Sequence, residues 1–150
     1  MSRARVVEAH SSSNSSMDLQ IGAVIVSHRP HLPDLERTIA ALVPQVDRLW
    51  VVDNGSGDAV VDRLREVMAA MHGSLIAFPE NRGIAAAHNA GLAAARMEGL
   101  DWVVLFDQDS IPAPTMVSEL AGCAKRLVAQ GHRLAAVGAR WMDQRSGRTG

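Results

Sequence analysis

The sequence has only one cysteine among its 150 residues, so no disulfide can form within the chain. This scarcity suits a reducing compartment. Cys123 stands among apolar neighbours in a segment with helical periodicity, and we interpret it as a small buried hydrophobic residue rather than a nucleophile. The cysteine content therefore argues against both a disulfide scaffold and thiol chemistry.

The sequence also lacks long apolar runs and a strong charge of either sign. No stretch approaches the length needed to span a bilayer, and the N-terminus has no apolar segment typical of a signal peptide. The formal net charge of −1 argues against a general attraction to nucleic acid or to an anionic membrane. We therefore expect a soluble or peripheral cytoplasmic protein that does not bind nucleic acid.

Several familiar cofactor motifs are absent as well. There is no Cys/His metal spacing, no Gly-x-Gly-x-x-Gly turn and no Walker loop. These absences argue against a dinucleotide-binding domain of the usual type and against a P-loop nucleotidase.

The composition is that of one globular domain, with 47% hydrophobic and 21% charged residues. A chain of this length can bury one sizeable core. Residues 1–18 include the polar run from Ser11 to Ser16 and are predicted to form a flexible tail. We expect residues 19–150 to form a single domain.

Apolar runs alternate with segments of helical periodicity along this domain. The expected strands cover residues 21–26, 49–52, 75–78, 102–106 and 134–137, and the expected helices cover about 33–46, 60–71, 84–97 and 113–130. The first run is continuously apolar, which is typical of a strand covered on both faces. The alternation predicts an α/β fold, Rossmann-like, with a mostly parallel sheet and helices on both faces.

Polar residues gather where the expected strands end. The four clusters are Ser27-His28, the segment from Asp53 to Ser56, the segment from Glu80 to Gly83, and the segment from Asp107 to Ser110. In open parallel sheets, ligands bind at the carboxyl ends of the strands. The clusters therefore predict one site along one edge of the sheet.

The last cluster carries the strongest chemical indication. Asp107 and Asp109 are one residue apart, and on an extended segment they would point to the same side. Two neighbouring carboxylates repel each other unless a cation lies between them, and a hard divalent ion is the usual partner. The alternative is that Asp109 caps the following helix with help from Ser110.

The other clusters allow two interpretations each. Asp53 shapes a turn with Asn54, or it accepts the N3 hydrogen of a uracil or thymine ring. Arg82 faces a phosphate or a base carbonyl, or it is a solvated surface residue. Gly83 opens a helix whose free amides could approach an anion. For the histidines at positions 28 and 88, an ordinary structural role is favoured over acid–base chemistry.

Taken in order, the sequence from about Ile21 to Arg140 resembles a family 2 glycosyltransferase with the GT-A fold. The stretches that carry the resemblance are 26–30 (VSHRP), 52–56 (VDNGS), 81–89 (NRGIAAAHN) and 106–110 (FDQDS). Each motif is weak alone, but their order and spacing are specific. The last two are similar to bacterial rhamnosyltransferases that use dTDP-rhamnose.

The resemblance implies a role for each matching residue. Asp53 would bind the nucleobase, Asp107 would lie near the ribose and the metal, and Asp109 would ligate Mn²⁺ or Mg²⁺. Other residues would border the same nucleotide-sugar pocket, namely Ser27, His28, Arg82, Gly83 and Asn89.

The resemblance also implies the reaction, which is a direct displacement with inversion at the sugar carbon. The general base and most of the acceptor site belong to the later half of such proteins, so we expect the base beyond residue 150 and interpret the sequence as truncated. The acceptor would be a glycan or a lipid-linked glycan in surface polysaccharide assembly. A lipid-linked acceptor would bring the protein to the inner face of the membrane as a peripheral protein.

Two alternatives stay open at this point. A catalytically inert, truncated nucleotide-binding remnant would share the same motifs. A receiver-like phosphoacceptor domain also places aspartates at strand ends, but it needs an acidic pair after the first strand and a lysine after the last. Here Ser27-His28 follow the first strand, and the only lysine, Lys125, falls within an expected helix.

Overall fold

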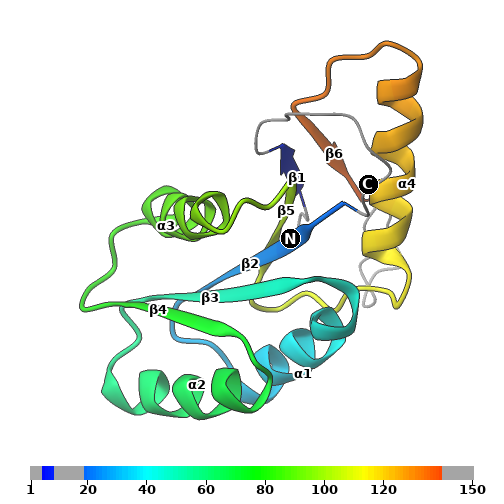
Figure 1. Cartoon of the computed structure of the whole chain (residues 1–150). Helices are drawn as coiled ribbons and strands as arrows, with labels where there is room; N and C mark the ends of the chain where they lie inside the picture. The colour runs from blue at the N-terminus through cyan, green and yellow to red at the C-terminus, as the bar shows by residue number, and fades with distance from the viewer. Residues whose placement is uncertain (1–4, 9–18, 140–150) are drawn as a thin grey trace, which may run out of the picture.

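The computed structural model describes residues 5–8 and 19–139 of the chain. A six-stranded sheet forms its centre, in the order β4-β3-β2-β5-β1-β6 (Figure 1). Four strands are parallel to one another: β2 (Ile21–Ser27), β3 (Arg48–Asn54), β4 (Ser74–Phe78) and β5 (Trp102–Asp107). The main helices are α1 (Leu32–Leu42), α2 (Asp58–Ala70), α3 (Ile84–Met97) and α4 (Met116–Ala129). The predicted α/β fold with a mostly parallel sheet is confirmed.

The central strands are buried on both faces, which explains their continuous apolar runs. In β2, Ala23 and Ile25 belong to the core on one face, whereas Val24 and Val26 belong to the core on the other. Successive side chains of a strand point to opposite faces, so a strand covered on both sides needs apolar residues at every position.

Helices cover both faces, as predicted. Residues of α1, α2 and α4 pack on the face that contains Ile25, and α3 packs on the face that contains Val24. Figure 1 shows α3 on one side of the sheet and α1 and α2 on the other. No helix in the described part of the chain is long and apolar enough to cross a membrane.

The small residues of α3 let this helix lie very close to the sheet. Ala87 and Ala95 are fully buried, and a Cβ atom on Gly91 would lie only 2.4 Å from a methyl group of Val24. A larger side chain at position 91 would therefore push the helix away from β2. The alanine-rich pattern correctly predicted this close packing.

Prolines account for two of the differences between predicted and observed boundaries. Helix α1 ends at Leu42 and is followed by a 3₁₀ turn, η1 (Val43–Gln45), instead of continuing to Val46. Pro44 has no N–H to donate to the carbonyl group one turn earlier, so the α-helical hydrogen-bond pattern cannot continue through it. Helix α4 begins at Met116, after Pro114, rather than at position 113. The last strand, β6 (Ala136–Gly138), begins two residues later than expected.

The prediction of a flexible tail is wrong for the part of that segment which the structure describes. Residues Arg5–Glu8 form strand β1, which pairs in antiparallel fashion with β5 on one side and with β6 on the other. The backbone N–H and C=O groups along the edge of β5 that faces β1 need hydrogen-bond partners. A strand that pairs there supplies them whether or not its own sequence has an apolar pattern. Residues 1–4 and 9–18 of the predicted tail lie outside the described residues.

Candidate functional site

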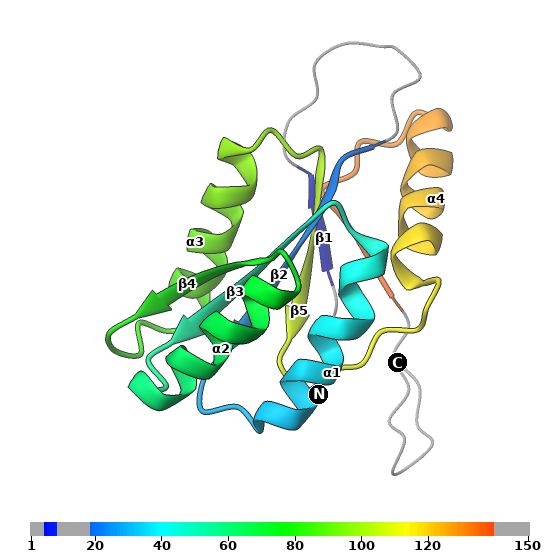
Figure 2. The same ribbon diagram turned by 60° about the horizontal axis from the view of Figure 1, so that its bottom comes forward.

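The four polar clusters lie along one edge of the sheet, at the carboxyl ends of its parallel strands (Figure 2). The strand register pairs Ser27 with Asp53 and places Asp107 opposite Val26. Phe78, the last residue of β4, is paired with Asn54. The structure thus brings together the segments that the sequence analysis singled out, at the edge where open parallel sheets bind ligands.

Asp53 is fully buried at the end of β3, where three protein groups donate hydrogen bonds to its carboxylate. The Ser27 hydroxyl donates to Oδ1 at 3.1 Å, and the Ser56 hydroxyl donates to the same oxygen. The Ser56 N–H donates to Oδ2 at 2.9 Å. Within this chain Asp53 therefore has the turn-shaping role of the first interpretation. Its contact with a nucleobase stays a prediction.

The turn after β3 lies directly against the loop after β4. Gly55 has a φ of +79°, and a Cβ atom there would lie 2.4 Å from the backbone carbon of Glu80. The Asn54 side-chain amide donates to Asn81 Oδ1 at 3.0 Å, and the N–H of Arg82 donates to Asn54 Oδ1 at 2.8 Å. These bonds fix the second and third clusters relative to each other.

Arg82, Gly83 and Asn89 are exposed where α3 begins. The guanidinium of Arg82 lies over the ring of Phe78, 5.1 Å from its centroid, which is a cation–π geometry. Gly83 precedes the helix with a φ of +83°, and its N–H donates to Asn81 Oδ1 at 2.8 Å. The first N–H groups of α3, which have no partners within the helix, therefore lie at this edge.

His28 is held from two sides in the loop after β2. Its Nδ1 lies 2.8 Å from the backbone carbonyl oxygen of Asn54, so Nδ1 carries the hydrogen and Nε2 is left for another partner. Its N–H donates to Gln108 Oε1 at 2.7 Å. The next residue, Arg29, donates its N–H to the hydroxyl of Ser56 at 2.8 Å. His28 thus has the structural role that its residue type favoured, and it also lies at the predicted site.

Asp107 is half-buried at the end of β5, and Asp109 is exposed. The expectation that both lie on an extended segment is wrong, because the strand ends at Asp107 and positions 108 and 109 form a turn. The alternative that Asp109 caps the next helix is also wrong, because α4 begins at Met116 and its N-cap is Thr115. Both carboxylates remain at the same edge of the sheet.

His88 is half-buried on α3 and interacts electrostatically with the carboxylate of Asp107. Burial lowers the pKa of His88, and the charge of Asp107 opposes this shift. The Nε2 atom of His88 and the hydroxyl oxygen of Ser110 are buried without a hydrogen-bond partner among the described residues. The sequence analysis placed Ser110 in the fourth cluster without a binding role and favoured a structural role for His88.

Sequence reasoning also missed four side chains that hold the site together. These are Asn54, Ser56, Asn81 and Gln108. All four belong to the polar clusters, so the sequence signal was present. It did not show which of the clustered side chains bind one another, because Asn54, Asn81, Gln108 and Ser56 also bind groups at or after the ends of other strands of the sheet.

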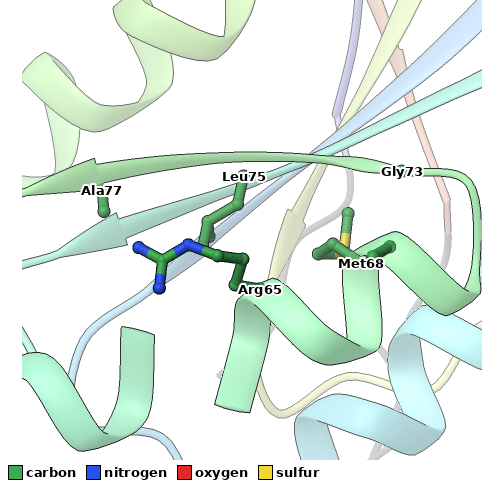
Figure 3. Close-up of a pocket in the computed structure, with 6 residues that line it drawn as sticks. Arg65, Met68, Gly73, Leu75 and Ala77 are labelled. Atoms are coloured by element: carbon green, nitrogen blue, oxygen red, sulfur yellow. The ribbon is translucent and has the colours of Figure 1, made fainter. Parts of the chain in front are cut away.

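A hollow between α2 and β4 has a volume of about 290 Å³ and contains none of the predicted site residues. It is lined by Arg65, Met68, Ala69, Gly73, Leu75 and Ala77 (Figure 3). The polar edge of the sheet is therefore the stronger candidate for a functional site.

Comparison with known proteins gives concordant results. Residues 23–146 match the family model described as Glycosyl transferase family 2. The dTDP-rhamnosyl transferase RfbF of Shigella flexneri is 36% identical over 94 residues, which cover 63% of this chain and 31% of that protein. The crystal structure of S. aureus TarS 1-349 matches 72% of this chain and 33% of that one, with a TM-score of 0.58 and 14% identity. The chain thus spans about a third of the length of these two proteins, and the likeness to TarS concerns the fold alone.

Proposed function

The chain belongs to glycosyl transferase family 2, and we propose that it forms the nucleotide-sugar-binding part of an inverting, metal-dependent glycosyltransferase. The observation that carries this proposal is the convergence of the polar ends of four parallel strands on one edge of the sheet. In open α/β sheets this edge binds nucleotides. The family match favours neither the receiver-like domain nor the inert remnant.

The proposed donor is dTDP-rhamnose. The 36% identity to a dTDP-rhamnosyl transferase supports this choice. Asp53 would accept the N3 hydrogen of thymine, and Ser27 and His28 would border the nucleotide. A carboxylate has about four acceptor positions. Groups among the described residues use three of these positions, two on Oδ1 and one on Oδ2, which leaves a position on Oδ2 for the base. Because Asp53 is fully buried, neighbouring side chains would have to move before a base could reach it.

Asp107 and Asp109 would hold a Mn²⁺ or Mg²⁺ ion. The residues described contain no group of three or more His, Cys, Asp or Glu side chains that could form a metal cage. Two carboxylates alone fit Mg²⁺ chemistry, since this ion is commonly bound by one or two carboxylates together with substrate phosphates. When bound, the ion would neutralise negative charge on the departing diphosphate. Arg82, Gly83 and Asn89 would line the same pocket at the start of α3.

The remaining parts of the reaction belong to the whole protein. The general base is expected beyond residue 150, and the acceptor would be a glycan or a lipid-linked glycan of bacterial polysaccharide biosynthesis. The protein would act in the cytoplasm, with peripheral attachment at the inner face of the membrane when its acceptor is lipid-linked.

Calorimetric titration of the chain with dTDP, with and without Mn²⁺, tests the proposal. We expect binding that requires the ion, and weaker binding of CDP, because N3 of cytosine carries no hydrogen that Asp53 could accept. Circular dichroism establishes that the chain is folded under the same conditions. A folded chain that binds dTDP neither with nor without Mn²⁺ would refute the proposal for this chain. Labelling of Asp53 by acetyl phosphate would favour the receiver-like alternative instead.

A further inference from the structure

Gln108 lies between the two carboxylates of the proposed metal site, yet its side chain points to a different part of the site. Its Oε1 atom accepts the backbone N–H of His28 at 2.7 Å, across 80 positions of sequence. This distance is at the short end of the range for N–H···O bonds. The residue between Asp107 and Asp109 therefore connects the turn after β5 to the loop after β2.

The loop after β2 is connected in turn to the end of β3. His28 Nδ1 bonds to the carbonyl oxygen of Asn54, and the N–H of Arg29 donates to the Ser56 hydroxyl, which donates to Asp53. Arg29 has a φ of +46°, a left-handed conformation that non-glycine residues rarely adopt. The loop thus takes an unusual shape in which two successive N–H groups, those of His28 and Arg29, each bind a side chain of a neighbouring cluster.

A glutamine suits this position for a physical reason. Its amide oxygen supplies the acceptor that the His28 N–H needs, and the neutral group adds no negative charge between two carboxylates. An asparagine, one methylene shorter, would place its acceptor about 1.5 Å farther away at the same backbone position.

We propose that Gln108 is a positioning residue that couples the metal-binding turn to the nucleotide-binding loop. When Asp107 and Asp109 bind a divalent ion, the turn at 108 and 109 is fixed, and Gln108 then fixes the loop through the N–H of His28. Since coupling between two sites is reciprocal, nucleotide binding also strengthens ion binding. This inference rests on the proposed function, because it assigns the two ends of the connection to the ion and the nucleotide.

The first test is an NMR titration of the ¹⁵N-labelled chain with Mg²⁺ alone. We expect the amide signals of both Asp109 and His28 to shift in the wild type. In Gln108→Met, which keeps the length of the side chain and removes its oxygen, Asp109 should still respond and His28 should not. Gln108→Glu restores an acceptor oxygen and should restore the His28 response. Gln130→Met, at an exposed glutamine just after α4, should behave as the wild type.

The second test measures coupling by calorimetry, as the ratio of the Kd values for dTDP without and with Mg²⁺. We expect Gln108→Met to reduce this ratio at least fivefold, the lower end of typical coupling between sites. A uniformly weaker affinity with an unchanged ratio would instead indicate a merely structural role and would overturn the proposal. The NMR test would also overturn the proposal in two cases. In the first, the His28 signal responds to Mg²⁺ equally in Gln108→Met and in the wild type. In the second, it responds in neither protein.

The two proposals can be separated by these results. If dTDP binding to the wild type depends on Mg²⁺ while the ratio is insensitive to position 108, the proposed function stands and the coupling is refuted. If folded wild-type protein binds neither Mg²⁺ nor dTDP, both are refuted.

Discussion

The hydroxyl of Ser27 donates a hydrogen bond to the carboxylate of Asp53, and both side chains are fully buried. Ser27 ends β2, and Asp53 is its register partner on β3. A carboxylate out of contact with water needs donors that replace its hydration. Ser27 therefore contributes to the stability of the site before any ligand binds.

Ser27→Ala should destabilise the fold by about 1–3 kcal/mol, because it removes one of the donors to a buried carboxylate. Urea unfolding followed by circular dichroism measures the effect. Ser74→Ala, at an exposed serine that begins β4, is the matched control and should change stability by no more than about 0.5 kcal/mol. Identical unfolding curves for Ser27→Ala and the wild type would show that the hydrogen bond contributes nothing.

Asp53→Asn should weaken dTDP binding by about 1–3 kcal/mol, because a charged acceptor of the N3 hydrogen is replaced by a neutral one. Calorimetry gives the affinity, and a dTDP analogue methylated at N3 provides a ligand-side control. The analogue should bind the wild type no better than dTDP binds the variant. Equal affinity of the wild type for both nucleotides would rule out base recognition by Asp53.

Asp109→Asn should abolish Mn²⁺-dependent nucleotide binding and leave the fold intact, because Asp109 is exposed in a turn. Calorimetry with dTDP and Mn²⁺ measures binding, and the melting temperature reports on the fold. Asp62→Asn, at an exposed position on α2, changes the net charge equally and should bind as the wild type. Undiminished binding by Asp109→Asn would remove this residue from the metal site.

Gly55→Ala should cost more than about 1 kcal/mol of stability, because the new methyl group meets backbone atoms and the φ of +79° disfavours alanine. Gly122→Ala is the matched control within α4, where the nearest atom is the flexible end of Arg126 at 3.5 Å. Alanine is the better helix former, so this control should stabilise the chain by about 0.5–1 kcal/mol. Chemical denaturation of both variants measures the contrast, and equal effects would contradict the observed packing of the turn.

His88 should make the stability of the fold decrease as the pH falls below neutrality. Burial lowers the pKa of His88 in the folded state below its ordinary value of 6.5, so the unfolded chain binds the proton more readily. The contribution of neutral His88 to the free energy of unfolding is therefore fully present above about pH 6.5. It is lost as the pH falls through the lowered pKa that His88 has in the folded state. Between about pH 7 and 5.5, the wild type should lose more stability than His88→Gln in urea unfolding. Parallel pH dependence of the two proteins would contradict this assignment.

Local patterns in the sequence determined the elements and the location of the site. The apolar run beginning at Ile21 is typical of a strand covered on both faces, and its alternation and that of the later apolar runs with helical periodicities predicted a parallel sheet. Parallel strands end at a common edge, so the positions of Ser27, Asp53 and Asp107 in the sequence were enough to predict that they gather there. Two of the boundaries that failed lie beside Pro44 and Pro114, where local chemistry ends a helix earlier or starts it later than periodicity indicates.

The tertiary structure alone decided how these groups pair. The antiparallel insertion of Arg5–Glu8 between β5 and β6 depends on a free strand edge, which no local pattern records. The bond from His28 to Gln108 joins residues 80 positions apart, and it exists only because β2 and β5 are neighbours in the sheet. The burial of Asp53 likewise follows from strand order, which places the hydroxyl of Ser27 beside it. Residue types thus determined which groups could take part in the site, and the order of the strands determined which of them meet. The reason is that a hydrogen bond forms only between groups in contact, and residues far apart in the sequence come into contact only through the fold.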